Sequence, residues 1–268
     1  MEFSILISTM NRSDLGFLDK MFPEHDINTL SLVIINQTTP KNKLATLLEN
    51  IKIINSFETG LSKSRNLAIE NCSTKFGLIA DDDLIYKAGF EVDIEKSIAN
   101  YATAGLIVFQ LENENNKAFK DYKNYSYELK TTKQLQNISS AEMLVNTELI
   151  KENNLAFDTR FGINAVFPMG EEQVFSRQLI NKRIKIQSVN LTIAQHHGKS
   201  SGQNPNSDAF IKTALAIRIP YLKKLIYLWM VKYILFLWRK KHIQFNEFRI
   251  TFRRMNQQLN FVKKHLKK

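Results

Sequence analysis

The stretch FGLIADDDLIY, residues 76–86, ends an apolar run with three consecutive aspartates. The apolar residues 76–80 predict a buried strand, so the aspartates stand at its carboxyl end. Like charges this close raise one another's pKa unless a cation or a hydrogen-bond network lies among them. The triplet therefore predicts either a solvated turn or a site that holds a cation.

Other apolar runs of strand length lie on both sides of this stretch, at residues 3–9, 30–36, 52–57 and 105–111. Segments of helical length alternate with them, at residues 42–50, 62–72 and 90–101. Strands that alternate with helices predict an α/β fold, a mostly parallel sheet flanked by helices. Ligands of such sheets bind beyond the carboxyl ends of the strands, where Asn11, Arg12 and Asp81 stand.

Two later segments are also expected to be ordered. Residues 160–183 turn helical after Gly170, with Glu171 and Glu172 in the first turn, where the helix dipole favours carboxylates. Residues 184–197 predict a short hairpin or edge strand that ends in His196 and His197.

The charge of the chain is divided unevenly. Of 37 Lys and Arg and 26 Asp and Glu, residues 218–268 hold 14 of the bases and one acid, Glu247. The rest of the chain carries 23 bases (37 less 14) against 25 acids (26 less 1), which argues against nucleic acid as the partner of the main body. The single Cys72 excludes an intrachain disulfide, and the first residues lack a secretory pattern, so we expect a reducing, cytoplasmic location.

The basic segment holds two apolar patterns. Residues 225–238 are apolar nearly all round but too short for a confident membrane span, so we expect them to be buried or to lie in a membrane interface. Further on, apolar residues recur every three or four positions, at Phe245, Phe248, Phe252, Met255, Leu259, Val262 and Leu266. This apolar seam on a basic helix predicts either an anionic membrane surface or a partner helix, including one from a second copy in a homo-oligomer.

The order of the motifs resembles the family 2 glycosyltransferases of the GT-A fold over residues 1–200. The resemblance rests on ISTMNR at 7–12, GLSKSRNLAIE at 60–70, IADDDLIY at 79–86, MGEEQVF at 169–175 and the histidine pair. It implies a GT-A domain at residues 1–215, followed by a basic amphipathic helical tail at 216–268. It also implies an inverting transfer of a sugar from a nucleotide donor, UDP-linked by default, to a hydroxyl acceptor.

The resemblance assigns roles to individual residues. Glu172 falls at the position of the general base, with Glu171 as the alternative. Asp82 and Asp83 fall at the metal motif, where Mn²⁺ or Mg²⁺ would bridge the diphosphate, and His197 or His196 is a candidate further ligand. The residues implied for nucleotide binding are Thr9, Asn11, Arg12, Asn36, Gln37, Ser62, Arg65 and Asp81. Ser62 is in addition expected to cap the helix that follows, and Lys63 to face the diphosphate.

The acceptor implied by the basic tail is a glycan or lipid-linked glycan of the cell surface, reached from the inner face of the membrane. Two other classes of function stay open. A metal-dependent nucleotidyltransferase also uses carboxylates on a doubly wound sheet, but it would carry a Gly-rich basic loop after the first strand. A scaffold protein would use only the seam of the tail helix, to pair with a partner.

Overall fold

The computed structural model describes residues 2–196 and 204–266 as two compact units. The first comprises residues 1–158 and 172–198, and the second comprises residues 159–171 and 199–268. The boundary expected at 215–216 falls within helix α6 (Asp208–Leu222) of the second unit.

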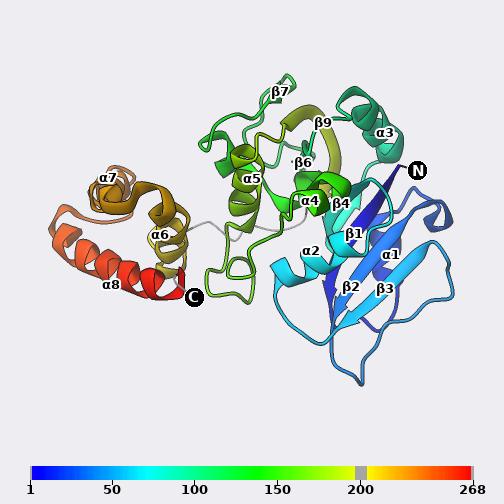
Figure 1. Ribbon diagram of the computed structural model, residues 1–268, viewed down its shortest axis with the longest axis horizontal. Helices are drawn as coiled ribbons and strands as arrows, with labels where there is room; N and C mark the ends of the chain where they lie inside the picture. The colour runs from blue at the N-terminus through cyan, green and yellow to red at the C-terminus, as the bar shows by residue number, and fades with distance from the viewer. Residues whose placement is uncertain (1, 197–203, 267–268) are drawn as a thin grey trace. The chain divides into compact units, whose positions relative to one another are not determined.

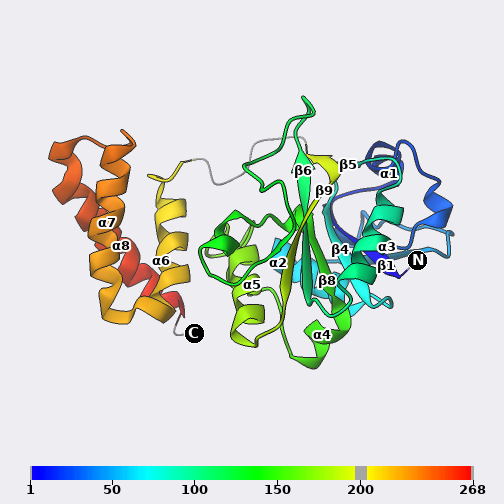
Figure 2. The same cartoon turned by 90° about the horizontal axis from the view of Figure 1, so that it is seen from above.

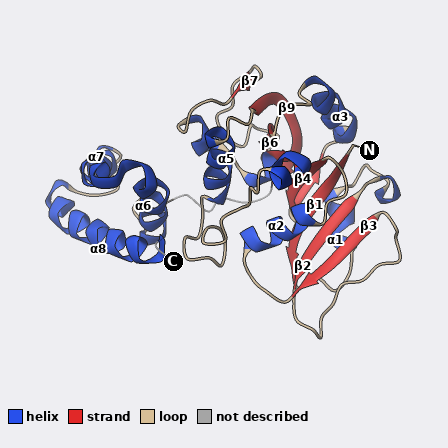
Figure 3. Ribbon diagram, in the orientation of Figure 1, coloured by secondary structure: helices blue, strands red, loops and turns tan. Residues whose placement is uncertain are grey.

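The first unit is built on one mixed sheet with helices on both faces (Figures 1 and 3). Among the described residues the strand order is β3-β2-β1-β4-β8-β6-β9-β5, and β7 pairs with β9. The strands are β1 (Phe3–Met10), β2 (Leu32–Gln37), β3 (Ile51–Ser56), β4 (Phe76–Asp81), β5 (Leu84–Tyr86), β6 (Leu106–Glu112), β7 (Tyr127–Glu128), β8 (Met143–Asn146) and β9 (Ile186–His196). The helices are α1 (Gly16–Met21), α2 (Leu61–Glu70), α3 (Phe90–Asn100), α4 (Thr147–Glu152) and α5 (Glu171–Asn181), with short 3-10 turns η1 (Ile27–Thr29), η2 (Gln134–Asn137) and η3 (Ser140–Glu142).

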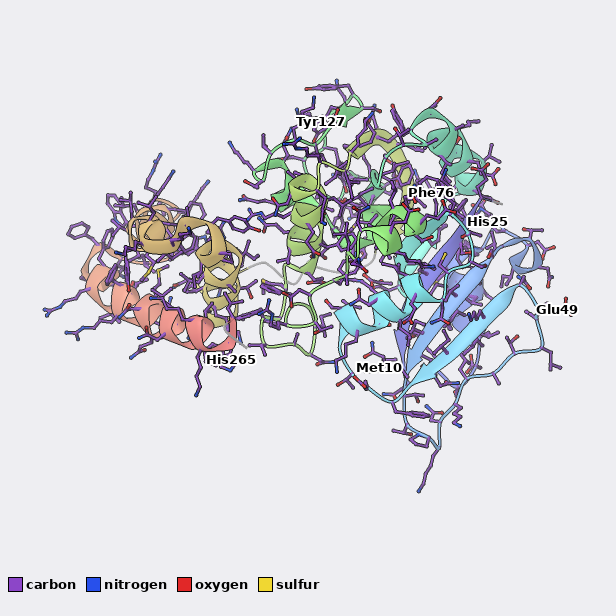
Figure 4. All side chains as sticks on the ribbon, viewed as in Figure 1. Met10, His25, Glu49, Phe76, Tyr127 and His265 are labelled. Carbon is purple, nitrogen blue, oxygen red and sulfur yellow. The ribbon has the colours of Figure 1, made fainter. Side chains whose placement is uncertain are left out.

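The direction of the strands defines one functional edge. The pairs β2–β3, β1–β2 and β1–β4 are parallel, while β8 is antiparallel to both β4 and β6. Strand β6 therefore runs in the same direction as β4, and β9 is parallel to β6. We call the end at which β1, β2, β4, β6 and β9 finish the carboxyl edge. In Figure 4, Met10 marks this edge and Phe76 marks the opposite one.

Side chains alternate between the two faces of the sheet along each strand, so the apolar residues form two cores, one on each face. On one face, Ile5 and Ile7 of β1 lie in a buried cluster with side chains of α1 and α3. On the other face, Leu6 lies in a cluster with Val33 and with side chains of α2, α4 and α5 (Figure 2). Adjacent residues of a strand point to opposite faces, so an apolar run without alternation is buried on both sides.

The strands predicted at residues 3–9, 30–36, 52–57, 76–80 and 105–111 are confirmed, but the predicted helix at 42–50 is wrong. The Asn55 side chain accepts a hydrogen bond from the Leu44 N–H at 2.9 Å and donates to its carbonyl oxygen at 2.8 Å. An amide side chain thus takes the hydrogen bonds that a helix would need from Leu44. Leu47 and Leu48 are exposed.

Two further expectations need correction. Residues 184–197 were predicted to be a short hairpin or an edge strand, but over the described part, up to His196, they are neither, because β9 (Ile186–His196) is one long strand between β6 and β5 that also pairs with β7. The residue that caps α2 is Gly60, whose φ of 129° favours glycine, and no side chain caps this helix. Ser62 lies inside the first turn and is buried.

The second unit holds helix α6, helix α7 (Ile226–Arg239) and helix α8 (Phe248–Leu266), joined by the 3-10 turns η4 (Lys223–Leu225) and η5 (Phe245–Glu247) (Figure 2). The apolar seam of α8 faces inward: Met255, Leu259 and Val262 are buried, and α8 packs against both α6 and α7. The seam is therefore occupied within the chain itself.

The two helices α7 and α8 allow a matched test of this packing, because Leu259 is fully buried and Leu228 is exposed. We expect Leu259→Ala to lower the free energy of unfolding of the second unit by about 2–5 kcal/mol, because a cavity is left in its core. Leu228→Ala should stay within about 0.5 kcal/mol of the parent chain. Urea unfolding followed by tryptophan fluorescence reports on this unit, since Trp229 and Trp238 both lie in α7. Equal effects of the two substitutions would contradict the packing.

Candidate active site

The three aspartates at the end of β4 each face a different basic side chain. Asp81 pairs with Arg65 of α2, and Asp82 pairs with Arg12 of the loop after β1. Asp83 faces His196, the last residue of β9, with 3.8 Å between its Oδ1 and Nε2 of the histidine. Repulsion within the triplet is thus offset by three separate groups.

Asp82 is the most strongly engaged of the three. Arg12 donates to its Oδ2 from Nη2 at 2.7 Å and from Nε at 3.0 Å, and the Thr9 hydroxyl donates to the same oxygen. The guanidinium of Arg12 also lies over the ring of Phe17, with 5.0 Å from Cζ to the centroid. Thr9, Arg12 and Asp82, predicted separately as site residues, therefore form one cluster.

The loop that carries Arg12 is held by Asn36 of β2. The Asn36 amide accepts from the Arg12 backbone N–H at 3.1 Å and donates to the Arg12 carbonyl at 3.0 Å. Asn11, in the left-handed conformation with φ of 55°, donates its N–H to the Gln37 carbonyl at 2.9 Å. Because Asn36 is fully buried, direct contact of its amide with a nucleotide would require these bonds to break.

The start of α2 is fixed in the same manner. The Gln37 side chain accepts from the Gly60 N–H at 2.7 Å, and the hydroxyls of Ser64 and Ser8 lie 2.9 Å apart. Gln37 and Ser62, both predicted to bind nucleotide, are buried here. Their predicted role stays a prediction, and what the structure adds is that Gln37 sets the position of the helix that carries Arg65.

Arg65 is a buried cation whose partners include Asp81 and Ser140. Its Nη2 donates to Asp81 Oδ1 at 3.1 Å and to Ser140 Oγ at 2.6 Å, and its side chain is only 1% exposed. A buried guanidinium is tolerated only when it is paired and hydrogen-bonded. Ser140 was not predicted from the sequence, because it lies 75 positions from Arg65.

Ser140 is itself positioned by the polar excursion between β6 and β8. Glu142, buried two residues later, accepts from the Lys120 ammonium at 2.8 Å and from the Tyr122 hydroxyl at 2.5 Å. Burial raises the pKa of the Glu142 carboxyl, while Lys120 opposes this shift. These two hydrogen bonds from the excursion thus hold η3, which includes Ser140, in place.

Asp83 is the carboxylate most open to solvent, with a side chain 50% exposed. Burial raises its pKa above the usual value for aspartate, His196 opposes the shift, and the charges of Asp81 and Asp82 add to it. A cation beside Asp83 would relieve this repulsion. His196 was the alternative ligand in the sequence analysis, whereas His197 lies outside the described residues.

Glu171 and Glu172 begin α5, as predicted. The other end of α5 lies near the amino ends of the strands, since Leu179 borders Gly105 just before β6 and β9 begins five residues after the helix ends. Since α5 packs on the sheet, its first turn points toward the carboxyl edge. Glu171 is buried and Glu172 is partly exposed, so Glu172 is the more accessible of the pair.

Glu112, the last residue of β6, was missed by the sequence analysis. It is mostly buried at the carboxyl edge, pairs with Lys87 at 2.7 Å and accepts from Gln195 at 3.1 Å. Its position directly after the apolar run 105–111 is the same signal that singled out the aspartates. The signal was therefore present in the sequence.

A metal site is not preformed within the part of the chain that the structure describes. Among these residues, no group of three or more His, Cys, Asp and Glu side chains could hold a metal ion. Mg²⁺ and similar ions, however, are often bound by one or two carboxylates together with substrate phosphates. The half-exposed Asp83 fits a cation held in that manner, with Asp81, whose Oδ1 pairs with Arg65, as its neighbour, whereas Asp82 accepts two hydrogen bonds from Arg12.

Comparison with known proteins finds likeness in structure alone. No family model matches the chain, and no curated protein matches it. TarS 1-349 of S. aureus in complex with UDP aligns with a TM-score of 0.55 at 18% identity, over 83% of this chain and 66% of that one. The same protein in complex with UDP-GlcNAc gives a TM-score of 0.58 at 18% identity, over 83% and 67% of the two chains.

Against the longer S. aureus TarS structure, the TM-score is 0.53 at 18% identity and the match covers 83% of this chain but 40% of that one. The chain thus spans about two thirds of the shorter TarS structures and less of the longer one. Identity this low establishes the fold and nothing finer. The GT-A-type α/β fold predicted from the sequence is confirmed, and membership of glycosyltransferase family 2 stays a prediction.

The bond from Arg65 to Ser140 can be tested by Ser140→Ala. We expect a loss of about 1–3 kcal/mol in the free energy of unfolding, because a buried guanidinium loses one of its hydrogen-bond acceptors. Ser73→Ala, at an exposed serine between α2 and β4, is the matched control and should be nearly neutral. Thermal or urea denaturation measures both, and an equal effect of the two would show that Ser140 does not hold Arg65.

Proposed function

We propose that the chain is a glycosyltransferase that moves a sugar from a nucleotide donor to a hydroxyl acceptor with inversion at the anomeric carbon. The observation that carries this proposal is the convergence of Asp81, Asp82 and Asp83 with Arg12 and Arg65 at the carboxyl edge. Ligands of open α/β sheets bind at this edge. The fold adds support, because TarS, with the same type of fold, has been crystallised with UDP and with UDP-GlcNAc.

A diphosphate suits the charges of this edge. Arg12 is 41% exposed and lies with Thr9 at the end of β1, so it is available to an incoming phosphate. Arg65 is buried and acts on Asp81, so we assign it a positioning role. Lys63 is more exposed than Arg65 and pairs with Glu58 at 2.6 Å. Because this ion pair is exposed, the Lys63 ammonium can exchange Glu58 for a phosphate.

We assign the divalent cation, Mn²⁺ or Mg²⁺, to Asp83 with Asp81, the diphosphate completing its ligands. When bound, such an ion stabilises the negative charge that develops on the leaving nucleoside diphosphate. Asp82 was expected to be the main ligand, but its Oδ2 already accepts two hydrogen bonds from Arg12. In this proposal Asp82 holds Arg12 at the edge.

Glu172 is proposed as the general base. It takes the proton of the acceptor hydroxyl as that oxygen bonds to the anomeric carbon and the bond from this carbon to the diphosphate breaks. Its place in the first turn of α5 suits a carboxylate, since the helix dipole favours negative charge there. Glu171, buried beside it, is the second choice.

The acceptor is proposed to be a glycan or lipid-linked glycan of the cell surface, met at the inner face of the membrane. The support is the basic second unit, with 14 Lys and Arg against one acid over residues 218–268. No helix in the described residues is long and apolar enough to span a bilayer. A UDP-linked sugar is the default donor.

The two other classes of function are less well supported. β1 is followed by Asn11, Arg12, Ser13 and Asp14, and no Gly-rich loop is present there as a nucleotidyltransferase would need. A scaffold that pairs through the α8 seam would need that seam to be available. Its central residues Met255, Leu259 and Val262 are buried in the chain itself.

The decisive experiment is hydrolysis and transfer with a panel of nucleotide sugars, in Mn²⁺, in Mg²⁺ and in chelator. We expect one donor to be turned over with metal only. Glu172→Gln should lower transfer by at least about 100-fold, the usual contribution of a general base, while UDP binding is kept. If no donor is bound under any condition, the proposed function fails.

The assignment of the cation is tested by Asp83→Asn and Asp82→Asn side by side. We expect Asp83→Asn to abolish the gain in UDP affinity that metal provides, whereas Asp82→Asn should retain it. Asp93→Asn, at an exposed carboxylate of α3, makes the same chemical change away from the edge and should behave as the parent chain. Titration calorimetry with UDP, with and without Mn²⁺, measures all three. If Asp82→Asn abolishes the gain and Asp83→Asn retains it, the cation is bound by Asp82 and the assignment fails.

A further inference from the structure

The second unit leaves one helix face without a partner in the described chain. Helix α7 buries Ile226, Met230, Ile234 and Leu237 against its neighbours, at spacings that return to one side of the helix. Most side chains on the opposite side are apolar as well. An amphipathic helix normally presents polar residues there, so this face calls for an explanation.

The α7 outer face consists of Leu225, Leu228, Val231, Leu235 and Trp238. Leu228 is 68% exposed, and Val231, Leu235 and Trp238 are 46%, 42% and 43% exposed. The spacing from residue 228 to 231, 235 and 238 keeps these side chains in one stripe along the helix. An exposed apolar stripe of this length is typical of an interaction surface.

The stripe continues beyond the end of α7. Phe245 of η5, which is 70% exposed, lies with its ring centroid 5.9 Å from that of Trp238. Tyr227, also exposed, lies near the beginning of the stripe. Aromatic side chains with a polar atom, such as Trp and Tyr, are enriched where a bilayer meets water.

Cations border this face and almost no acids do. Lys224, Lys232 and Arg239 are exposed and recur at spacings of seven and eight, which places them along the same side as the stripe. Over residues 218–268, Glu247 is the one acid among 14 Lys and Arg. A second copy docked here would bring two strongly positive surfaces together, whereas an anionic lipid surface complements the charge.

We propose that the α7 outer face docks on an anionic lipid bilayer, with α7 lying in the plane of the interface. Leu228, Val231, Leu235 and Trp238 enter the region below the lipid headgroups, while Lys224, Lys232 and Arg239 meet lipid phosphates. At 14 residues, α7 is too short to cross the hydrocarbon core, which agrees with this orientation. The inference rests on the proposed membrane location of the enzyme but on no step of its reaction.

The site of docking differs from the one predicted from the sequence. The apolar seam at Phe245–Leu266 was expected to be the membrane or partner surface, yet its central residues are buried within the second unit. The expectation for residues 225–238 had two alternatives, burial or a membrane interface. Helix α7 combines them, since one side is buried and the other is exposed.

The first experiment is co-sedimentation of the full chain with vesicles of phosphatidylcholine alone or mixed with phosphatidylglycerol. We expect binding to the anionic vesicles and a much weaker signal on the neutral ones. Leu228→Glu with Leu235→Glu should lower the partition coefficient at least about tenfold, because two apolar side chains are lost and two negative charges are added. Leu47→Glu with Val92→Glu makes the same changes at two exposed sites of the first unit and should leave binding nearly unchanged.

A second measurement reports on the face itself. The chain has two tryptophans, so Trp229→Phe leaves Trp238 as the only one. We expect lipids brominated on their acyl chains to quench the fluorescence of Trp238 when anionic vesicles are added. Binding by the Leu228→Glu, Leu235→Glu variant at the level of the parent chain would overturn the proposal, and so would unquenched Trp238 in the vesicle-bound protein.

Two controls separate this proposal from its alternatives. If light scattering shows that the double variant dissociates a dimer while vesicle binding stays unchanged, the face is an interface between copies and the proposal fails. Vesicle binding is measured without nucleotide, and UDP binding is measured without vesicles. A chain that binds UDP but no vesicles refutes the docking alone, and a chain that binds vesicles but no nucleotide sugar refutes the proposed function alone.

Discussion

The candidate site depends on the pairing of three adjacent carboxylates with three different basic side chains. Arg12 comes from the loop after β1, Arg65 from α2 and His196 from the end of β9, so the aspartates connect three distant parts of the chain. Like charges at consecutive positions would otherwise repel one another. The loops at the carboxyl edge are therefore held by electrostatic attraction in addition to the strand pairing below them.

Much of the fold could be predicted, because its parallel strands are buried on both faces and read as continuous apolar runs. Leu6 and Ile7, for example, belong to different cores. The errors have one physical origin. The Asn55 amide replaces helical hydrogen bonds at Leu44, and β9 extends through polar positions because it pairs with three strands, β5, β6 and β7. Both depend on partners distant in sequence, which local patterns do not encode.

The candidate site divides in a similar way. The residue types at the strand ends were predictable, because a polar cluster after an apolar run indicates the carboxyl edge of a sheet. The sequence did not indicate which of these residues hold the loops and which stay available to a ligand. Asn36, predicted to contact nucleotide, bridges the N–H and carbonyl of Arg12, and the bond from Arg65 to Ser140 appears only when the excursion folds back. Long-range hydrogen bonds decide which polar side chains stay available to a ligand.

The second unit extends this argument to apolar residues. The hydrophobic period of α8 is regular, yet a regular period cannot distinguish a partner helix within the chain from a lipid surface, since each takes the same amphipathic face. The pattern of α7 is less regular because it combines an inward face at Met230 and Ile234 with an outward one at Leu228 and Leu235. What distinguishes the two helices is the apolar surface left after packing. That remainder lies on α7, within the most basic part of the chain, and this combination of apolar surface and positive charge is what the proposed docking on anionic lipid rests on.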